Sequence, residues 1–189
     1  MSKLFFICPE CCYEDEIKFY FDDECYFITS LGVVLQLFDK AYWDGVEDFI
    51  TEKNIKEIFI AQSIDCSFLE TGAYSTEPRF STKAEQRLIE LREKIVNNPI
   101  QSTSLKIKLS ELNILDSFNA WFANSTIVEQ KVRVGELAIK GVILSKQKQS
   151  VSQFAQDKGG SSLHYVDLKA FLETNKVASQ TQFKLVKND

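Results

Sequence analysis

Two short apolar runs in the first third of the chain, each followed by a cysteine, most constrain its fold. Residues 4–7 read Leu-Phe-Phe-Ile and precede Cys8, and residues 58–61 read Ile-Phe-Ile-Ala and come shortly before Cys66. Continuous apolar runs without polar alternation are typical of strands that are covered on both faces, as in parallel sheets. The carboxyl ends of neighbouring parallel strands meet at one edge of a sheet, so we expect Cys8 and Cys66 to lie close together. Because thiolates are preferred ligands of tetrahedral Zn²⁺, the pair predicts part of a metal site.

The segments around these runs predict a parallel sheet with a crossover helix. Strands are predicted over 4–8, 25–29 and 57–61, and apolar residues between about 34 and 53 recur at helical spacing. A strand–helix–strand order of this length is the right-handed crossover unit of parallel sheets. We therefore predict a three-layer α/β fold with a mainly parallel central sheet of four or five strands.

The second half predicts further elements and a boundary. In chain order, these are a loop over 68–80, a helix over 83–96 capped by Ser81 or Thr82, a short strand over 105–109, a helical region over 111–134, strands over 137–144 and 151–154, a helix over 163–174 and an edge strand over 183–186. The double glycine at 159–160 suggests a hinge or tight turn. We therefore divide the chain into an α/β domain over 1–157 and a C-terminal extension over 158–189 that packs on it.

Composition excludes several classes of function. A formal charge of -5, without a basic cluster interleaved with aromatic residues, argues against a nucleic-acid partner. The apolar run near the N-terminus is too short for a signal-peptide core or a membrane span. Five cysteines without a secretory signal indicate reduced thiols or metal ligands. We expect a cytoplasmic protein that binds neither membranes nor nucleic acids.

The residues around the two cysteines resemble the motifs of the β-class carbonic anhydrases. In that family one strand ends in C-x-D-S-R-x-x-P-E and a later one in G-H-x-x-C-G, and zinc is held by the first Cys, the His and the second Cys. Residues 8–16 read C-P-E-C-C-Y-E-D-E and match the first motif at Cys8 and Glu16. Residues 62–67 read Q-S-I-D-C-S and match the second motif at Cys66.

Other segments extend the likeness. Residues 26–34, 54–60 and 127–141 follow family patterns, so the resemblance covers roughly residues 4–154. It implies the family's α/β fold and a zinc site. Only the two cysteines and their spacing are specific, since the linking patterns are common to many α/β proteins.

The departures from the family concern the zinc site itself. Ser63 stands where the family has its histidine ligand, Glu10 where it has Asp, and Cys12 where it has Arg. The resemblance then implies a metal site of Cys8, Cys66 and Glu10, with Glu10 also the candidate catalytic residue. Other donors nearby are Cys11, Cys12 and Asp65.

The loss of the arginine predicts poor catalysis. In the family, this Arg pairs with the Asp and holds it away from zinc. Without a guanidinium that binds it in a bidentate manner, Glu10 is expected either to ligate the metal, which closes the open position, or to turn to solvent. Both outcomes oppose CO₂ hydration. We therefore predict a divergent carbonic anhydrase-like protein without efficient CO₂ hydration.

Two alternatives stay open. The first is a zinc-dependent lyase or hydrolase that uses the altered site of Cys8, Glu10 and Cys66, with a small-molecule ligand in the old cleft. The second is a thiol redox protein built on the C-x-x-C pair of Cys8 and Cys11. It ranks lower because the acidic run at 14–16 is expected to raise the pKa of these thiols.

The remaining predictions concern assembly and the only histidine. The family's dimer is built partly by an N-terminal helical arm, and only three residues precede Leu4. A homodimer would therefore use the C-terminal extension or the aromatic helix around Trp121. Trp121 and Phe122 are interpreted as core or subunit-interface residues, ahead of a ligand-stacking role. His164 is interpreted as a partly exposed helix residue, with zinc ligation as the alternative.

Overall fold

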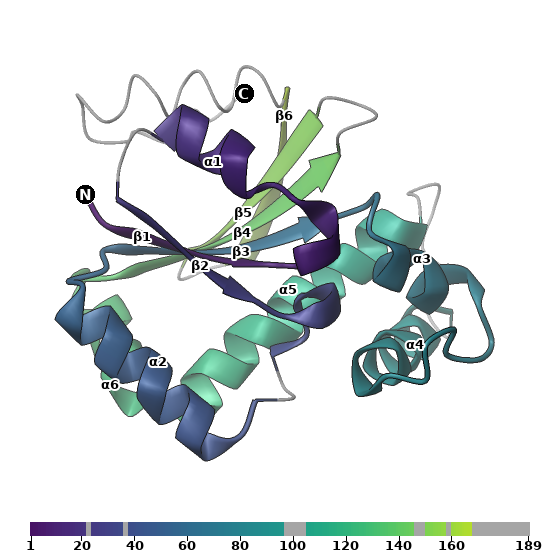
Figure 1. Cartoon of the computed structure of the whole chain (residues 1–189), viewed down its shortest axis with the longest axis horizontal. Coiled ribbons are helices and arrows are strands. Elements are labelled where there is room, and N and C mark those ends of the chain that lie inside the picture. The colour runs from purple at the N-terminus through teal and green to yellow at the C-terminus, as the bar shows by residue number, and fades with distance from the viewer. Residues whose placement is uncertain (22–23, 36–37, 97–104, 146–149, 158–159, 168–189) are drawn as a thin grey trace.

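A single mixed sheet forms the centre of the molecule. The computed structural model describes residues 1–21, 24–35, 38–96, 105–145, 150–157 and 160–167 (Figure 1). Within these ranges the sheet has six strands, more than the four or five predicted, in the order β2-β1-β3-β4-β5-β6. The strands are β1 (Lys3–Ile7), β2 (Cys25–Thr29), β3 (Glu57–Ser63), β4 (Ala138–Ser145), β5 (Ser150–Asp157) and β6 (Gly160–Asp167). The first four in chain order pair in parallel and the last two antiparallel, which confirms the predicted α/β class with a mainly parallel sheet.

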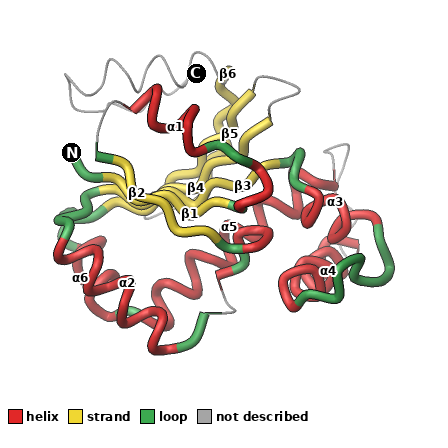
Figure 2. Tube along the Cα trace, in the orientation of Figure 1, coloured by secondary structure: helices red, strands yellow, loops and turns green. Residues whose placement is uncertain are grey.

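Helices cover the sheet and one of its edges. They are α1 (Glu14–Phe21), α2 (Lys40–Glu52), α3 (Ser67–Tyr74), α4 (Lys83–Val96), α5 (Leu105–Asn124) and α6 (Thr126–Arg133), with short 3-10 helices at Pro9–Cys11 and Leu31–Val33. Figures 1 and 2 show α1 on one face of the sheet and α2, α5 and α6 on the other. Helices α3 and α4 lie beyond the carboxyl ends of the parallel strands (Figure 1). The chain therefore has the three layers that the sequence predicts.

Alternate side chains of β1 pack into two separate hydrophobic cores. Leu4 and Phe6 belong to the larger cluster, whereas Phe5 and Ile7 belong to the smaller one on the opposite face. All four are at most 2% exposed, as expected for a strand that is covered on both sides. The Phe6 ring packs edge-on against Trp121, with 5.5 Å between ring centroids. Trp121 is fully buried, so its interpretation as a core residue is confirmed.

Register brings the two predicted cysteine positions to the same edge. Ile7 lies opposite Ala61 in the parallel pair of β1 and β3. The residues that follow these strands, including Cys8 and the turn that carries Cys66, therefore emerge side by side. This edge is where open parallel sheets hold their ligands.

Two predictions in the middle of the chain are wrong. Residues 67–74 form α3, where a loop was expected partly because of Gly72. A side chain at Gly72 would lie 2.6 Å from the Cβ of Leu88, so this glycine permits the close packing of α3 on α4 and does not form a turn. Residues 105–109 begin α5 although Leu-Lys-Ile-Lys-Leu alternates like a strand. The packing of this helix on the core overrides the local pattern.

The predicted C-terminal helix is also wrong over its described part. Residues 163–167 belong to β6, whose Leu163 lies opposite Phe154 of β5. His164 therefore lies on a strand. The rest of the predicted helix and the predicted edge strand at 183–186 lie outside the described residues, and the division at 157/158 stays a prediction.

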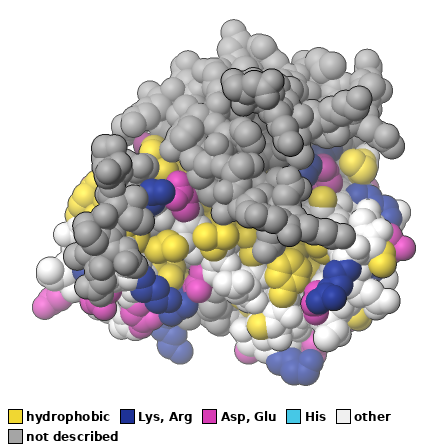
Figure 3. Space-filling view, turned by 180° about the vertical axis from the view of Figure 1, so that it is seen from behind, with side chains coloured by type: hydrophobic (Ala, Val, Ile, Leu, Met, Phe, Trp, Pro, Cys, Tyr) yellow, Lys and Arg dark blue, Asp and Glu magenta, His cyan; other side chains and the backbone are white. Residues whose placement is uncertain are grey.

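The described surface is mixed in charge. On the face seen in Figure 3, basic and acidic side chains of the described residues lie among each other and among apolar ones. Of the helices in the described ranges, none combines the length and apolar character needed to cross a bilayer.

Candidate metal centre

A 3-10 turn after β1 places two thiols on the same side of the chain. Cys8 directly follows β1 and precedes the 3-10 helix Pro9–Cys11, in which Pro9 occupies the first position. The backbone N–H of Cys11 donates to the carbonyl oxygen of Cys8 at 3.0 Å. This turn brings the side chain of Cys11 back to that of Cys8, and the two sulfur atoms lie within 4.8 Å of each other.

A second turn, after β3, supplies the third thiol. The N–H of Asp65 donates to Oγ of Ser63 at 3.1 Å, and the N–H of Cys66 donates to the Ser63 carbonyl oxygen at 3.3 Å. Cys66 then occupies the N-cap position of α3. Ser63, at the position where the sequence resemblance implies the family's histidine ligand, thus uses its hydroxyl to close this turn.

The three sulfur atoms converge. The Sγ atoms of Cys8, Cys11 and Cys66 all lie within 4.8 Å of one another, and those of Cys8 and Cys66 are 3.5 Å apart. Tetrahedral Zn–S bonds of about 2.3 Å would separate the sulfurs by about 3.8 Å. The donor set therefore fits a thiolate-binding metal ion, and the predicted convergence of Cys8 and Cys66 is confirmed.

The three thiols share one negative charge. Hydrogen bonds from Cys11 and then Cys66 lower the pKa of Cys8 to about 3 against the opposing effect of burial. The N–H of Gly32, 3.4 Å from the Cys8 Sγ, adds to this effect. The same contacts with Cys66 and Cys8, together with burial, raise the pKa of Cys11.

The third thiol also stays protonated. The contact with Cys11 lowers the pKa of Cys66, but donation to Cys8 together with burial raises it to about 12. Cys8 is therefore the thiolate of the group. The expectation that the acidic run raises the pKa of both C-x-x-C thiols is wrong for Cys8, because thiol donors in direct contact outweigh more distant charges.

Glu10 lies beside this cluster and is held by α3. Its Oε1 accepts a hydrogen bond from Oγ of Ser67 at 2.5 Å, and its Oε2 accepts one from the Ser67 N–H at 3.2 Å. Oε2 also lies 3.8 Å from the Sγ of Cys66. The carboxylate is thus near the sulfurs without belonging to the close group of three, and Ser67 is a partner that sequence reasoning missed.

Cys12 does not join the cluster. Cys12 has a left-handed backbone with φ of 49°, and its exposed thiol donates to the Pro9 carbonyl oxygen at 3.5 Å. It therefore does not take the role of the family's Arg toward Glu10. Glu16 lies on α1, and its side chain is outside the described part of the structure.

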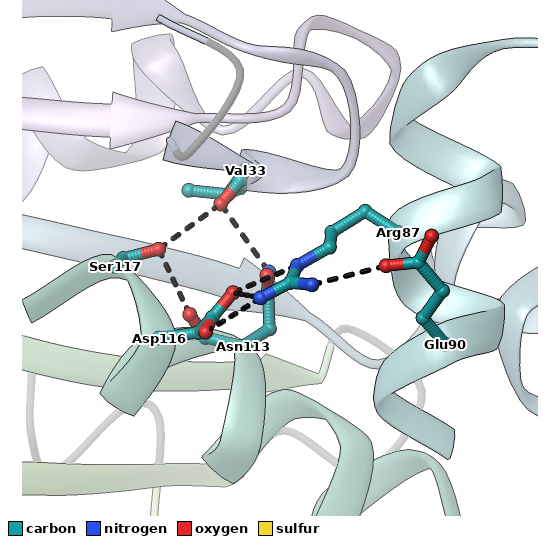
Figure 4. A network of polar contacts seen from close by, with 6 residues as sticks. All are labelled: Val33, Arg87, Glu90, Asn113, Asp116 and Ser117. Carbon is teal, nitrogen blue, oxygen red and sulfur yellow. Dashed lines mark hydrogen bonds and ion pairs between the residues drawn. The ribbon is translucent and has the colours of Figure 1, made fainter. Parts of the chain in front are cut away.

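A buried polar network holds the turn at Gly32 and Val33 next to the cluster. Gly32 and Val33 both have left-handed backbones, with φ of 59° and 55°. For the β-branched Val33 this conformation is strained. The side-chain amide of Asn113 donates to the carbonyl oxygens of Gly32 and Val33, at 2.9 and 3.2 Å. The hydroxyl of Ser117 also donates to the carbonyl oxygen of Val33, at 3.4 Å, and Figure 4 shows the contacts of Val33 with both side chains. The turn that presents the Gly32 N–H to Cys8 is therefore fixed by α5.

The sequence contained a signal for this network. Leu109, Asn113, Ser117 and Trp121 recur every four residues on α5, and all four are buried. Polar residues within an apolar helical stripe need buried partners. Asn113 finds one more in Gln62, whose Oε1 accepts its amide at 2.8 Å.

An ion pair fastens α4 to the same helix. The guanidinium of Arg87 donates to both carboxylate oxygens of Asp116, at distances of 2.9 to 3.1 Å, and also pairs with Glu90 at 3.0 Å (Figure 4). Asp116 lies between Asn113 and Ser117 along α5. The pair therefore links α4 to the helix that carries Asn113 and Ser117.

Solved structures identify the architecture. The β-carbonic anhydrase CafD of the fungus Aspergillus fumigatus aligns with a TM-score of 0.63 over 81% of this chain and 88% of its own, at 18% identity. A tetrameric β-carbonic anhydrase of Sordaria macrospora aligns with a TM-score of 0.62 over 85% of this chain and 81% of its own, at 15% identity. The fold is that of the β-carbonic anhydrases.

This result confirms the resemblance at the level of the fold. A Coccomyxa β-carbonic anhydrase in complex with acetazolamide aligns over 96% of this chain and 84% of its own, with a TM-score of 0.54 and 17% identity. No protein-family model and no curated protein matches the sequence. The predicted cysteine ligands Cys8 and Cys66 lie together in this fold, and the third donor near them is Cys11.

Proposed function

We propose that this chain is a divergent carbonic anhydrase-like protein whose zinc is held by Cys8, Cys11 and Cys66, and which lacks efficient CO₂ hydration. The observation that carries the proposal is the convergence of the three sulfurs within 4.8 Å. Cys11 takes the place that the sequence prediction gave to Glu10. Two of the three cysteines are almost fully buried, at 1% exposure for Cys8 and 2% for Cys66. Such burial favours a role as metal ligands over a role as nucleophiles, which need access to their substrates.

The ligand set explains the low activity expected. Zinc bound here would supply Lewis acidity, which is weaker when three thiolates leave the centre with one net negative charge than when a neutral histidine replaces one of them. The hydroxyl oxygen of Ser63 accepts the Asp65 N–H in the β3–α3 turn. Cys12 bonds to the Pro9 carbonyl. Neither residue supplies the histidine or the guanidinium that the family motif contains.

Metal analysis of untagged protein tests the metal centre. We expect about one zinc per chain in the wild type and a loss of most of it in Cys66→Ser, because two thiols bind zinc much more weakly than three. Cys12→Ser is the matched control, since its exposed thiol lies outside the cluster, and it should keep its zinc. Folded wild-type protein that contains no metal and takes up none on dialysis would overturn the proposal.

Stopped-flow measurement of CO₂ hydration tests the predicted lack of efficient catalysis. The zinc-loaded protein is expected to show a rate indistinguishable from buffer. A rate within a few orders of magnitude of an active β-carbonic anhydrase would contradict this expectation and would show that a three-thiolate centre suffices.

A zinc-dependent lyase or hydrolase is the second candidate, and one observation favours it. The carboxylate of Glu10 lies 3.8 Å from the Cys66 sulfur, where it could accept a proton from a molecule bound beside the cluster. Hydrolysis of small esters by the zinc-loaded protein would support this candidate if Glu10→Gln abolished the hydrolysis and still bound zinc. The redox alternative ranks lower, because burial of Cys8 and Cys66 restricts access to a partner thiol or disulfide.

The proposal includes a cytoplasmic location and a homo-oligomeric state. A reducing compartment would keep the five cysteines as thiols, the state that they have in the structure. The tetrameric assembly of the Sordaria macrospora enzyme supports the proposal that this chain also forms a homo-oligomer. Light scattering at several protein concentrations measures the oligomeric state directly.

A further inference from the structure

Ser67 holds Glu10 in a position that neither sequence-based alternative includes. The carboxylate does not join the three sulfurs, and although Glu10 is exposed it does not turn away from the site, because the Ser67 hydroxyl and N–H bind one carboxylate oxygen each. Both donors belong to the first residue of α3, where N–H groups without helical partners and the helix dipole favour an anion.

Resting on the metal site proposed above, we propose that Ser67 is a positioning residue that replaces the missing arginine and keeps one coordination position open for an exogenous ligand. Cys8 and Cys66 are buried, whereas Glu10 is exposed, so the carboxylate lies on the solvent side of the sulfurs. A molecule that enters from solvent to complete the coordination would contact Glu10.

Charge defines the class of this ligand. Three thiolates around a divalent ion leave one net negative charge, and the carboxylate of Glu10 adds a second. Ser67 holds this carboxylate with two neutral groups, so the contact brings no positive charge to offset it. An anion at the open position would be repelled at close range, whereas a neutral donor that carries a hydrogen could bind the metal and donate to Glu10. The site therefore favours neutral protic nitrogen or oxygen donors over small anions.

The first experiment uses the full chain loaded with Co²⁺, whose visible absorption reports the ligands around the ion. Imidazole and azide are titrated separately at about pH 8, where imidazole is largely neutral. We expect imidazole to change the spectrum with at least about tenfold higher affinity than azide. Azide affinity equal to or above that of imidazole would overturn the assignment of the ligand class.

The second experiment tests Ser67. In Ser67→Ala the carboxylate loses its hydroxyl donor and can swing onto the metal, so imidazole affinity should fall by about tenfold or more. Ser67→Thr keeps a hydroxyl and should restore it. The double variant Glu10→Ala with Ser67→Ala removes the competing carboxylate and should also restore imidazole binding, an outcome that a merely structural role of Ser67 would not produce.

The two proposals fail in different ways. If Co²⁺ bound to the wild type gives no sulfur charge-transfer absorption, the proposed metal centre is wrong. If that absorption is present but imidazole binds equally well to the wild type and to Ser67→Ala, the metal centre stands and the role of Ser67 is wrong. Should Ser67→Ala not fold, the wild type still tests the proposal. Sulfur charge-transfer absorption that imidazole does not change in the wild type would overturn the open position.

Discussion

Asn113 of α5 donates its side-chain amide to the carbonyl oxygen of Gly32 at 2.9 Å, across 81 positions of the sequence. Gly32 is the residue whose N–H donates to the Sγ of Cys8. A side chain at Gly32 would lie 3.0 Å from Leu88 Cδ1 in a backbone conformation that suits glycine. The hydrogen bond from Gly32 to the Cys8 sulfur therefore depends on a buried amide of α5, a helix that carries none of the three sulfurs.

Replacement of this amide should weaken both the fold and the metal site. Asn113→Leu leaves the carbonyl oxygen of Gly32 without its buried donor, and leaves that of Val33 with only the hydroxyl of Ser117 at 3.4 Å. This should cost about 1–3 kcal/mol in the free energy of unfolding. Metal affinity should fall as well, because the turn that presents the Gly32 N–H loosens. Urea unfolding and competition with a zinc chelator measure the two effects. Asn119→Leu, at an exposed position of the same helix, is the control and should change neither; equal behaviour of the two variants would contradict the role of the network.

Zinc binding should release about two protons, not three. Cys8 is a thiolate above pH of about 3, whereas Cys11 and Cys66 keep their protons at neutral pH because their pKa values are raised, that of Cys66 to about 12. Each protonated thiol must lose its proton to bind the metal, so affinity should rise with pH by about two powers of ten per unit near neutrality. Calorimetry in buffers of different ionisation enthalpy gives the proton count.

Cys12→Ser again provides the matched control for this measurement. Its thiol lies outside the cluster, so the number of protons released should not change. A release of three protons by the wild type would show that the Cys8 thiol is protonated in the metal-free protein.

The sequence predicted what depends on local pattern and strand order. The apolar runs before Cys8 and Cys66 specified buried parallel strands, and parallel strands in register bring their ends together. The same local chemistry predicted the cap of α4, where Thr82 Oγ1 accepts the N–H of Glu85 at 3.2 Å. These features follow from the nature and spacing of neighbouring residues.

The choice of the third sulfur and the position of Glu10 depend on geometry that the pattern does not contain. Residues 8–11 could have formed an extended loop with Glu10 turned inward, but the 3-10 turn directs Cys11 to the sulfurs. The partner of Glu10 is Ser67, which is 57 positions away and lies on a helix that the sequence prediction took for a loop. Because α3 itself was missed, its N-terminus was not available as a binding partner for the carboxylate.

The ion pair between α4 and α5 should depend on the shape of the guanidinium. Arg87→Lys keeps the charge but loses the bidentate contact with Asp116, and both side chains are largely buried, at 26% and 16% exposure. We expect a loss of about 1 kcal/mol in the free energy of unfolding. Arg133→Lys is the matched control, since its pair with Glu129 lies on the surface of one helix, and it should change stability by less than about 0.5 kcal/mol. Equal losses in the two variants would contradict a special contribution of the Arg87 pair.

The carboxylate of Glu85 organises the loop before α4 and should not tolerate an amide. Glu85 is fully buried, and its oxygens accept the N–H groups of Arg79 at 3.1 Å, Phe80 at 2.9 Å and Thr82 at 3.2 Å. Glu85→Gln turns one acceptor into a donor that faces these N–H groups, so we expect a loss of about 1–3 kcal/mol in stability. Hydrogen exchange should also become faster at the amides of Arg79 and Phe80, because a single remaining oxygen cannot accept all three N–H groups. Glu93→Gln, exposed on the same helix, serves as the control. Unchanged exchange at both amides in Glu85→Gln would show that the loop is held by other contacts.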